Sequence, residues 1–370
     1  CITRAYYFDK NRFNYFNPFC IIKYQFIHVS KIIKMGIRNV LNLSIFAFVN
    51  MNVVKYRKII VFYFSGTGNA KRTSQWIVEK AKKIGIESKL INIANFTEIK
   101  KLSFSENTII GFCYPTHGFN APPIVLKFLV KFPKSNTDIF LINTRAGMKL
   151  HKIFTPGISG FAIILPAIIL KLKGYRLIAS RPLDLPSNWI SFHPGLKENV
   201  IRSIFARCHN IIDKFADKIF TGKKIYRAWF DLPIDILISP ISLGYYIIGR
   251  FALAKTFFTN DACNKCGICA EFCSTNAIKL IDNRPYWTFN CESCMKCMNS
   301  CPKRAIETAH IFTFFLWWIA FSVAPLYVFK FIKNVLNFRF HYLISEIIYC
   351  IVGIIIIWLS YYFLHFLLRY

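Results

Sequence analysis

Eight of the 13 cysteines in this 370-residue chain lie in two compact blocks that share one spacing. Both blocks, 263–273 and 291–301, read C-x2-C-x2-C-x3-C. Three thiolates spaced by two residues can bind three corners of one 4Fe-4S cubane, and the fourth cysteine, beyond a three-residue step, binds the neighbouring cluster. The spacing therefore predicts two 4Fe-4S clusters with exchanged fourth ligands. One cluster is expected on Cys263, Cys266, Cys269 and Cys301, and the other on Cys291, Cys294, Cys297 and Cys273.

Structural zinc is the alternative for any C-x2-C pair. Zinc sites, however, use two cysteine pairs separated by a longer loop, not three evenly spaced ligands and a fourth. The tails of the blocks, 274–278 and 302–306, both end in Ala-Ile, which indicates internal duplication. Clustering favours metal in a reducing cytoplasm over disulfides. The five scattered cysteines are interpreted as small buried hydrophobic residues: Cys1, Cys20, Cys113, Cys208 and Cys350.

A glycine-rich turn, 64–70, follows the first strongly apolar segment and precedes a helical pattern. The backbone N–H groups of such a turn and of the helix start converge on an anion, and short polar side chains add donors. The turn lacks both a Gly-Lys-Ser/Thr ending and a G-x-G-x-x-G fingerprint, so it favours a phosphate monoester over a nucleotide triphosphate or dinucleotide. The candidate phosphate-binding residues are Ser65, Gly66, Thr67, Gly68, Asn69 and Ala70.

Short apolar runs alternate with helical patterns from residue 58 onward, which predicts a parallel sheet flanked by helices. The expected strands are 59–64, 88–92, 108–114, 138–143 and 175–181, and the expected helices are 70–84, 122–132, 158–173 and 196–220. Residues 51–230 are therefore expected to form a three-layer, doubly wound α/β domain with five parallel strands. The apolar segment 158–170 is interrupted by Pro166 and is too short for a membrane span, so it is expected to pack in the core.

Residues 260–308 resemble the bacterial two-cluster ferredoxins in both cysteine blocks. Ser274 departs from the family, which usually has proline after the fourth cysteine, and this change costs rigidity without affecting ligation. The resemblance implies a small α+β domain, placed at 261–309, whose clusters each exchange one electron at low potential.

Residues 58–222 resemble flavodoxins, and the turn at 64–70 resembles their FMN phosphate loop. The resemblance implies that the flavin ring lies at the carboxyl ends of the third and fourth strands. Tyr114, His117 and Phe119 are then candidate ring neighbours, and the backbone of 144–147 is expected to meet the ring's polar edge. The residues implied at these two places are Tyr114, Pro115, Thr116, His117, Gly118, Asn143, Thr144, Arg145 and Gly147. Taken alone, His117 is interpreted as a hydrogen-bonded loop histidine.

Two departures from flavodoxins are visible. Ala70 replaces a hydroxyl residue that often ends the phosphate loop, and the chain is basic where free flavodoxins tend to be acidic. The alternative is therefore a flavodoxin-like domain whose turn holds no cofactor. The order of the two domains, with Pro186-Ser-Asn-Trp-Ile190 after the fifth strand, resembles the flavodoxin–ferredoxin fusion proteins of anaerobic bacteria and archaea.

Residues 231–260 are interpreted as a linker with one or two short helices. After it and the ferredoxin-like segment, 310–370 contains two apolar stretches, 311–329 and 343–368, each long enough to span a bilayer and rich in tryptophan and tyrosine. One or two transmembrane helices are expected there, in the cell membrane with the redox domains on the cytoplasmic side. The alternative is buried helices of a soluble oligomer. Residues 1–50 are expected to be upstream reading frame before a start at Met51, or a basic arm on a membrane surface.

The formal net charge is +30, from 48 Lys and Arg against 18 Asp and Glu. Codon bias is one interpretation, because the abundant Phe, Ile, Lys, Asn and Tyr are encoded by AT-rich codons. The other is a positive field that attracts an acidic redox protein or anionic membrane lipids. No basic run is interleaved with aromatics in a binding motif, so no nucleic-acid partner is predicted. The sequence does not indicate an oligomeric state.

Three functions are consistent with these features. The first is a membrane-associated electron-transfer protein in which the clusters exchange electrons with FMN. The second is a flavin-dependent reductase of a small oxidant such as a quinone. The third is a redox sensor whose flavodoxin-like domain is empty. No paired carboxylates, Ser-His-Asp order or zinc-protease motif is present, so no catalytic residue is predicted.

Overall fold

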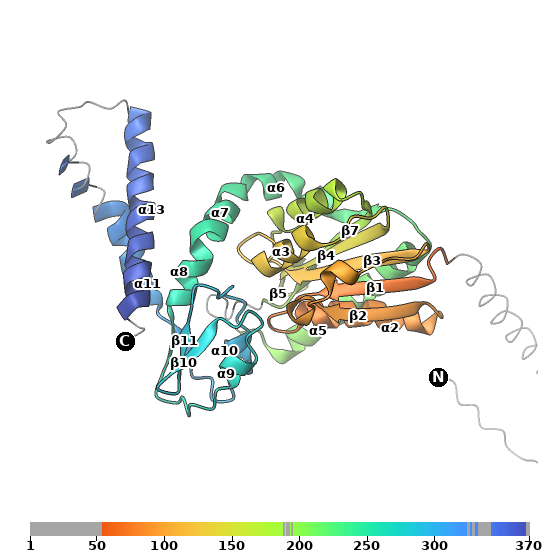
Figure 1. Ribbon diagram of the computed structural model, residues 1–370, viewed down its shortest axis with the longest axis horizontal. Helices are drawn as coiled ribbons and strands as arrows, with labels where there is room; N and C mark the ends of the chain where they lie inside the picture. The colour runs from red at the N-terminus through yellow and green to blue at the C-terminus, as the bar shows by residue number, and fades with distance from the viewer. Residues whose placement is uncertain are drawn as a thin grey trace, which may run out of the picture. The chain divides into compact units, whose positions relative to one another are not determined.

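The computed structural model describes residues 54–187, 189, 193, 195–323, 326–327, 330–331 and 342–367 (Figure 1). Lys55–Tyr370 form one compact unit. The predictions for residues 1–50 and for a start at Met51 lie outside the described residues.

A six-stranded parallel sheet forms the first domain. Its strands are β1 (Lys58–Tyr63), β2 (Glu87–Asn92), β3 (Thr108–Pro115), β4 (Asp138–Ala146), β7 (Arg176–Leu185) and β8 (Ile225–Tyr226). They are arranged in the order β2-β1-β3-β4-β7-β8. The first five strands are those predicted, and the two-residue β8 was not anticipated. An order in which the second strand lies outside the first, followed by the third, fourth and fifth, is that of the flavodoxin-like doubly wound fold.

Two pairs of helices cover the faces of this sheet (Figure 1). On one face α2 (Asn69–Lys83) packs against α5 (Glu198–Phe220), and on the other α3 (Pro123–Lys131) packs against α4 (Phe161–Leu172). All four begin and end within three residues of the prediction. The core under α3 and α4 is aromatic: Phe62 lies 5.6 Å from Phe112 and 5.2 Å from Phe132 between ring centroids. Helix α4 packs in this core, as expected, with Ala162 and Leu170 fully buried.

The segment that leaves the sheet is helical over almost its whole length. It contains η3 (Arg227–Asp231), α6 (Leu232–Leu237), α7 (Ser239–Gly244), the π turn η4 (Tyr245–Gly249) and α8 (Arg250–Lys255). Two carboxylates attach it to the first domain. Asp231 accepts a hydrogen bond from Arg145 at 2.7 Å, and Asp235 accepts one from the Gly160 N–H at 2.7 Å. One or two short helices were predicted, so the linker contains more helix than expected.

The small domain consists of two antiparallel strand pairs and two short helices. Strand β9 (Phe257–Thr259) pairs with β12 (Ile306–Thr308), and β10 (Ile278–Ile281) pairs with β11 (Arg284–Trp287). Helices α9 (Ile268–Glu271) and α10 (Lys296–Ser300) each lie inside one cysteine block. Strand β9 lies within the range predicted as linker, so the small domain includes residues before 261.

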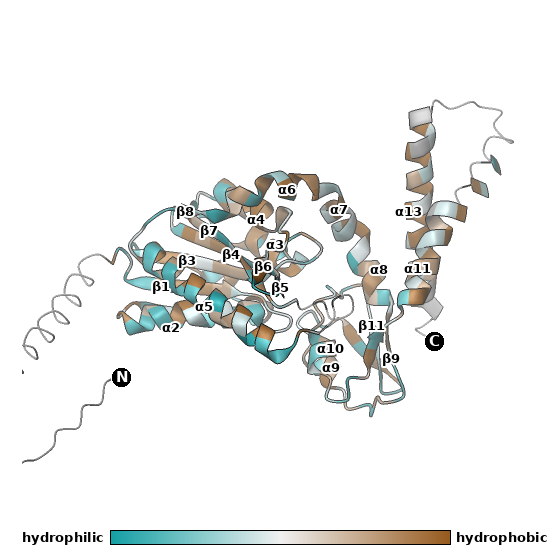
Figure 2. Cartoon of the chain, turned by 180° about the vertical axis from the view of Figure 1, so that it is seen from behind, coloured by the Kyte–Doolittle hydropathy of each residue, from teal (hydrophilic) through white to brown (hydrophobic). Residues whose placement is uncertain are grey.

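The described C-terminal residues form α11 (His310–Trp318), the π turn η5 (Ile319–Val323) and α13 (Tyr342–Leu367). Hydrophobic residues recur along α11 and α13 (Figure 2), and many, such as Phe314 and Trp358, are exposed. Among the described residues, no single helix combines the length and continuous hydropathy of a membrane span. Arg227–Leu237 and Ser239–Lys255 pass such a test only together, with a 79° bend between them. The predicted spans at 311–329 and 343–368 are therefore not supported.

Candidate functional site

The two cysteine blocks have the same backbone conformation. In each block, the first two cysteines precede a short helix and the third lies within it. The fourth cysteine follows the helix and precedes a strand. Three positions in each block and its tail adopt positive φ, and they correspond one to one after a shift of 28 residues. The pairs are Lys265 and Ser293 (φ 58° and 50°), Gly267 and Met295 (75° and 58°), and Asn276 and Arg304 (51° and 48°). The duplication read from the sequence therefore extends to the turns, although only Gly267 gave a sequence signal for a left-handed position.

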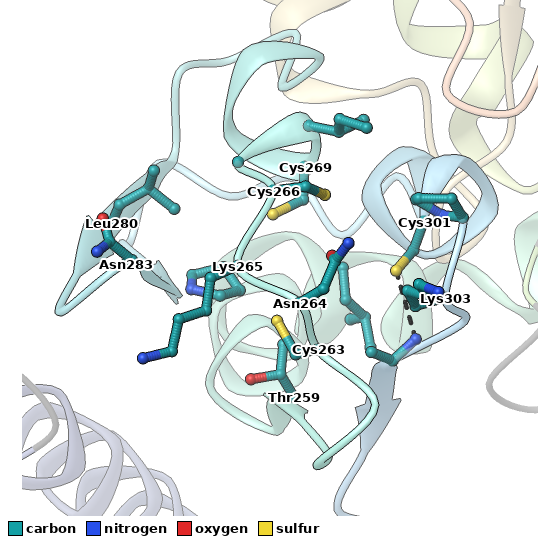
Figure 3. Close-up of a pocket in the computed structure, with 16 residues that line it drawn as sticks. Thr259, Cys263, Asn264, Lys265, Cys266, Cys269, Leu280, Asn283, Cys301 and Lys303 are labelled. Carbon is teal, nitrogen blue, oxygen red and sulfur yellow. Dashed lines mark hydrogen bonds between the residues drawn. The ribbon is translucent and has the colours of Figure 1, made fainter.

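The structure brings Cys301 into contact with the first block. Cys263, Cys266, Cys269 and Cys301 line one hollow that is partly open to solvent. Their sulfur atoms face this common space (Figure 3). The Ala305 N–H donates to Cys301 Sγ at 3.3 Å. Among the described residues no three His, Cys, Asp or Glu side chains converge as around a single metal ion. The four thiols instead border a wider space, and soft sulfur donors with backbone N–H groups beside them suit an iron–sulfur cubane.

Cys273 lies with the second block. Burial raises the pKa of Cys297 to about 12 and that of Cys294 to about 11, and in both cases the neighbouring Cys273 raises it further. The Ala277 N–H donates to Cys273 Sγ at 3.2 Å, the counterpart of the bond at Cys301. Bare thiols in this place are protonated at neutral pH, so metal binding would release their protons. The exchanged grouping predicted from the spacing is thus the grouping that the fold places together.

The two groups of cysteines differ in exposure. We call Cys263, Cys266, Cys269 and Cys301 the outer set, and Cys291, Cys294, Cys297 and Cys273 the inner set. Cys266 of the outer set is exposed, whereas Cys291 and Cys297 of the inner set are each only 9% exposed. Among the eight ligands, Cys266 is therefore the one presented most directly to a partner in solution.

The glycine-rich turn joins β1 to α2 as predicted. Gly68 has φ 105° and is the N-cap of α2, so no side chain caps the helix. Its N–H donates to Ser65 Oγ at 3.0 Å. Thr67 Oγ1 is buried and makes no hydrogen bond within the described chain. An uncapped helix start with a buried, unpaired hydroxyl beside it suits a phosphate group. The Asn69 side chain departs from the prediction, because its Nδ2 donates to the Pro186 carbonyl at 2.8 Å.

The turn after β3 is tight, and one of the predicted ring neighbours packs in the core. His117 and Asn120 exchange backbone hydrogen bonds of 2.8 and 3.0 Å, with positive φ at Gly118 and Phe119. His117 Nδ1 is buried without a partner, and burial lowers the pKa of this histidine to about 4. Tyr114 is fully buried and donates to the Ala162 carbonyl at 2.9 Å, so its ring packs in the core; that it borders a flavin stays a prediction.

The predicted loop at 143–147 is mostly strand. β4 continues to Ala146 alongside β7, and the Gly147 N–H donates to the Leu185 carbonyl at 2.7 Å. The Thr144 carbonyl accepts from the Thr116 N–H at 2.8 Å. These two backbone groups are therefore engaged within the sheet, and contact of 144–147 with the ring's polar edge stays a prediction. Arg145 is also engaged, because its guanidinium bonds Asp184 at 2.6 Å as well as Asp231.

Four buried polar atoms nevertheless remain without partners at the carboxyl ends of β1, β3 and β4. They are Thr67 Oγ1, His117 Nδ1, Asn143 Oδ1 and Thr144 Oγ1. An unpaired buried polar atom costs about 1–3 kcal/mol, so a group of them indicates a ligand or water. Their place, where the strand order reverses, is where doubly wound folds bind ligands. These residues are therefore candidate partners for a flavin mononucleotide.

The inner set lies directly against the glycine-rich turn. A Cβ built on Gly66 would lie 2.2 Å from the Cys294 carbonyl oxygen, so only glycine allows this approach. Glu292 is 7% exposed and lies beside the Ile124 N–H at the start of α3, and burial raises the pKa of this carboxyl to about 7. Sequence reasoning found neither Glu292 nor the linker residue Tyr245, which contacts Gly118. Both contacts join segments that are far apart in the chain, so no local sequence pattern predicts them.

Comparison with known proteins identifies part of the small domain. The 4Fe-4S binding domain family matches residues 257–279, which include the first cysteine block. This match supports at least one 4Fe-4S cluster on the chain. No curated protein matches.

Several solved structures are similar to the first domain. A flavodoxin from the domain Archaea has 15% identity over 43% of this chain and 98% of its own, with a TM-score of 0.28. Megasphaera elsdenii flavodoxin has 14% identity over 43% and 98%, with a TM-score of 0.29. An azoreductase from Bacillus anthracis has 11% identity over 44% and 99%, with a TM-score of 0.30. These identities and TM-scores are low. The flavodoxin-like fold is therefore assigned from the order of the strands in the sheet.

Proposed function

We propose that this chain is an electron-transfer protein that holds two 4Fe-4S clusters on the outer and inner sets and FMN at the glycine-rich turn. The observation that carries the proposal is the approach of Gly66 to Cys294, because it brings one cysteine set against the turn. Bound there, the clusters would carry electrons singly and FMN would hold one or two, which couples one-electron to two-electron partners. The partially exposed outer set would face the partner protein, and the buried inner set would face the flavin.

The chain's own residues have distinct roles in this proposal. The uncapped start of α2 and Thr67 would bind the phosphate, and His117, Asn143 and Thr144 would offer their unpaired atoms to the ring system. Backbone N–H groups at Ala277 and Ala305 would donate to ligand sulfurs, which raises a cluster's reduction potential. The linker would fix the distance between the two domains through Asp231 and Asp235.

Cofactor content tests the proposal. Protein purified without oxygen should contain about eight iron atoms, eight sulfides and one FMN per chain. The visible sulfur-to-iron absorption and the EPR spectrum of the reduced protein should show 4Fe-4S clusters. Zinc in place of iron would overturn the proposal. Iron without FMN would favour the redox sensor with an empty flavodoxin-like domain.

The partners and the location are part of the same proposal. The net charge of +30 supports an acidic redox protein as partner, whose association should slow steeply with added salt. The exposed apolar side chains of α11 and α13 support association with membrane lipids, with the redox domains on the cytoplasmic side. Flotation of the full chain with anionic vesicles tests this association. A protein that stays in the lipid-free fraction would argue against it.

A hollow beside the inner set favours reduction of a small oxidant as the second candidate function. Lys127, Arg250, Phe251, Phe289 and Glu292 line it, and Cys291 forms part of its wall. Aromatic walls with two cations suit a planar, oxygen-bearing ring such as a quinone. Arg250→Gln should then slow steady-state quinone reduction by the dithionite-reduced protein. Lys131→Met, at the exposed end of α3, is the control. An equal rate in both variants would remove this candidate.

A further inference from the structure

The linker residue Tyr245 lies on the turn that closes the flavin side of the first domain. A Cβ built on Gly118 would lie 2.0 Å from Tyr245 Cδ1 and 2.1 Å from its Cγ. The phenol ring therefore covers the Gly118 backbone, and a side chain at position 118 would displace it. On its other side, a Cβ built on Gly249 would lie 2.9 Å from Tyr245 Cδ2. The ring is thus confined between two glycines.

The linker is fixed at this turn by a second, independent contact. The Ser242 hydroxyl donates to the Phe119 carbonyl at 2.9 Å, and Ser242 is fully buried. Tyr245 follows three residues later and begins the π turn Tyr245–Gly249. A π turn is rare and occurs frequently at functional sites, because its extra residue re-aims the side chains around it. The backbone around Tyr245 is therefore shaped to place this ring on Gly118.

The same ring also lies near the inner cysteine set. Trp189 meets it edge to face at 6.4 Å between centroids. Burial raises the pKa of the Tyr245 phenol, and Cys291, Glu292 and Cys294 would each raise it further when ionised, so all three lie within electrostatic reach. Because Gly66 contacts Cys294, the ring, the glycine-rich turn and the inner set meet in one region.

We infer that Tyr245 forms an aromatic wall of the flavin ring site, on the side that faces the inner cysteine set. The inference rests on the proposed function and adds a residue from the linker, outside the flavodoxin-like domain. A phenol ring offers a flat face to a planar heteroaromatic ligand, and stacked aromatic pairs contribute roughly a factor of 2 to 10 to a binding constant. The linker would then contribute to cofactor binding as well as joining the domains.

Titration of the cluster-loaded full chain with FMN, followed by flavin fluorescence, tests the inference. Tyr245→Ala should weaken FMN binding by about tenfold, and Tyr245→Phe should leave it within about twofold of the parent protein. Ile247→Ala is the matched control, because it lies in the same π turn and its side chain is 56% exposed. Its affinity should not change.

The outcomes separate this inference from the proposed function. An unchanged affinity in Tyr245→Ala would overturn the inference while leaving the flavin site in place. A tighter affinity would show that the ring occupies the flavin's own position, and would also overturn it. A parent protein that binds no FMN would remove the flavin part of the proposed function itself. If Tyr245→Ala loses its iron, Tyr245→Leu keeps apolar volume without an aromatic face and should show the same weakening. The absorption bands of the bound flavin should shift in Tyr245→Leu and not in Tyr245→Phe.

Discussion

Met295 has φ 58° at the position where the first cysteine block has Gly267. A left-handed conformation costs an L-residue roughly 1–2 kcal/mol, so other interactions must hold it. The Met295 side chain is 2% exposed in the core of the small domain, and its carbonyl accepts hydrogen bonds from both the backbone and the side chain of Asn299. The second block therefore keeps the conformation of the first through packing, where the first uses glycine.

Double substitutions test the exchanged ligand sets. Cys263→Ala with Cys301→Ala removes two ligands of the outer set only, so about four iron atoms per chain should remain. Cys291→Ala with Cys301→Ala damages both sets and should leave almost none. Iron analysis of anaerobically purified variants distinguishes the two, with circular dichroism as the check on folding. The reverse pattern would mean that each block binds its own cluster.

Gly66→Ala tests the contact between the turn and the inner set. The new Cβ would meet the Cys294 carbonyl oxygen, a backbone atom that can yield only if the loop moves. Overpacking of this kind costs about 1–3 kcal/mol, so we expect a lower thermal midpoint and faster loss of iron from the inner set. Gly244→Ala is the control, since a Cβ there has no atom within 4 Å. Equal thermal midpoints and equal rates of iron loss in the two variants would contradict the contact between Gly66 and Cys294.

At the scale of elements, the strands and helices of the first domain could be predicted because their apolar patterns are local. Strand β4 was predicted to end at Asn143, three residues before its actual end at Ala146, because the polar residues Asn143, Thr144 and Arg145 are typical of a loop. Arg145 is buried in the strand because Asp184 and Asp231 neutralise it, and both carboxylates come from distant segments. The cysteine spacing is also a local pattern, so the two sets of candidate ligands could be predicted from the sequence. Tyr245 was not, because Gly118, which it contacts, lies 127 positions earlier in the chain.

Asp138 joins three elements and makes stability depend on pH. Its carboxylate, 4% exposed, accepts hydrogen bonds from Lys55 and Tyr56 at 2.6 Å before β1, and from Arg176 at 2.7 Å in β7. Burial alone would raise the pKa of Asp138, but these three bonds lower it below its usual 3.8. Burial and the Asp138 carboxylate raise the pKa of Tyr56 above its usual 10.

The two pKa shifts have opposite directions, so Asp138 limits the stability of the fold at low pH and Tyr56 limits it at high pH. Asp138 stabilises the fold above pH 3.8, and this contribution is lost as the pH falls further; the neutral Tyr56 contributes fully below pH 10 and less above it. Tyr56→Phe should cost about 1.5–3 kcal/mol at neutral pH and make the thermal midpoint fall less between pH 10 and 11. Tyr226→Phe, which loses only a partly exposed bond to the Leu177 carbonyl, is the control. Parallel alkaline profiles for the parent protein and Tyr56→Phe would refute this assignment.

At the scale of the molecule, the two cysteine sets lie at different depths. The outer set includes the exposed Cys266, whereas the inner set lies between the small domain, the linker and the glycine-rich turn and borders a hollow at Cys291. In the proposed function, a cluster on the outer set would receive electrons from the partner, and a cluster on the inner set would pass them to the flavin. The same difference in access should govern the loss of iron.

A ferrous chelator should therefore remove iron in two phases. The first phase, about half of the iron, should come from the outer set, because Cys266 is exposed, and the second should be slower because Cys291 and Cys297 are nearly buried. Absorbance of the chelate during anaerobic incubation follows both phases. Cys263→Ala with Cys301→Ala should abolish the fast phase, and Cys291→Ala with Cys273→Ala should abolish the slow one. Gly66→Ala, which disturbs the cover of the inner set, should accelerate only the slow phase. A single phase in the parent protein, or a fast phase that survives loss of the outer ligands, would mean that depth does not separate the two sets.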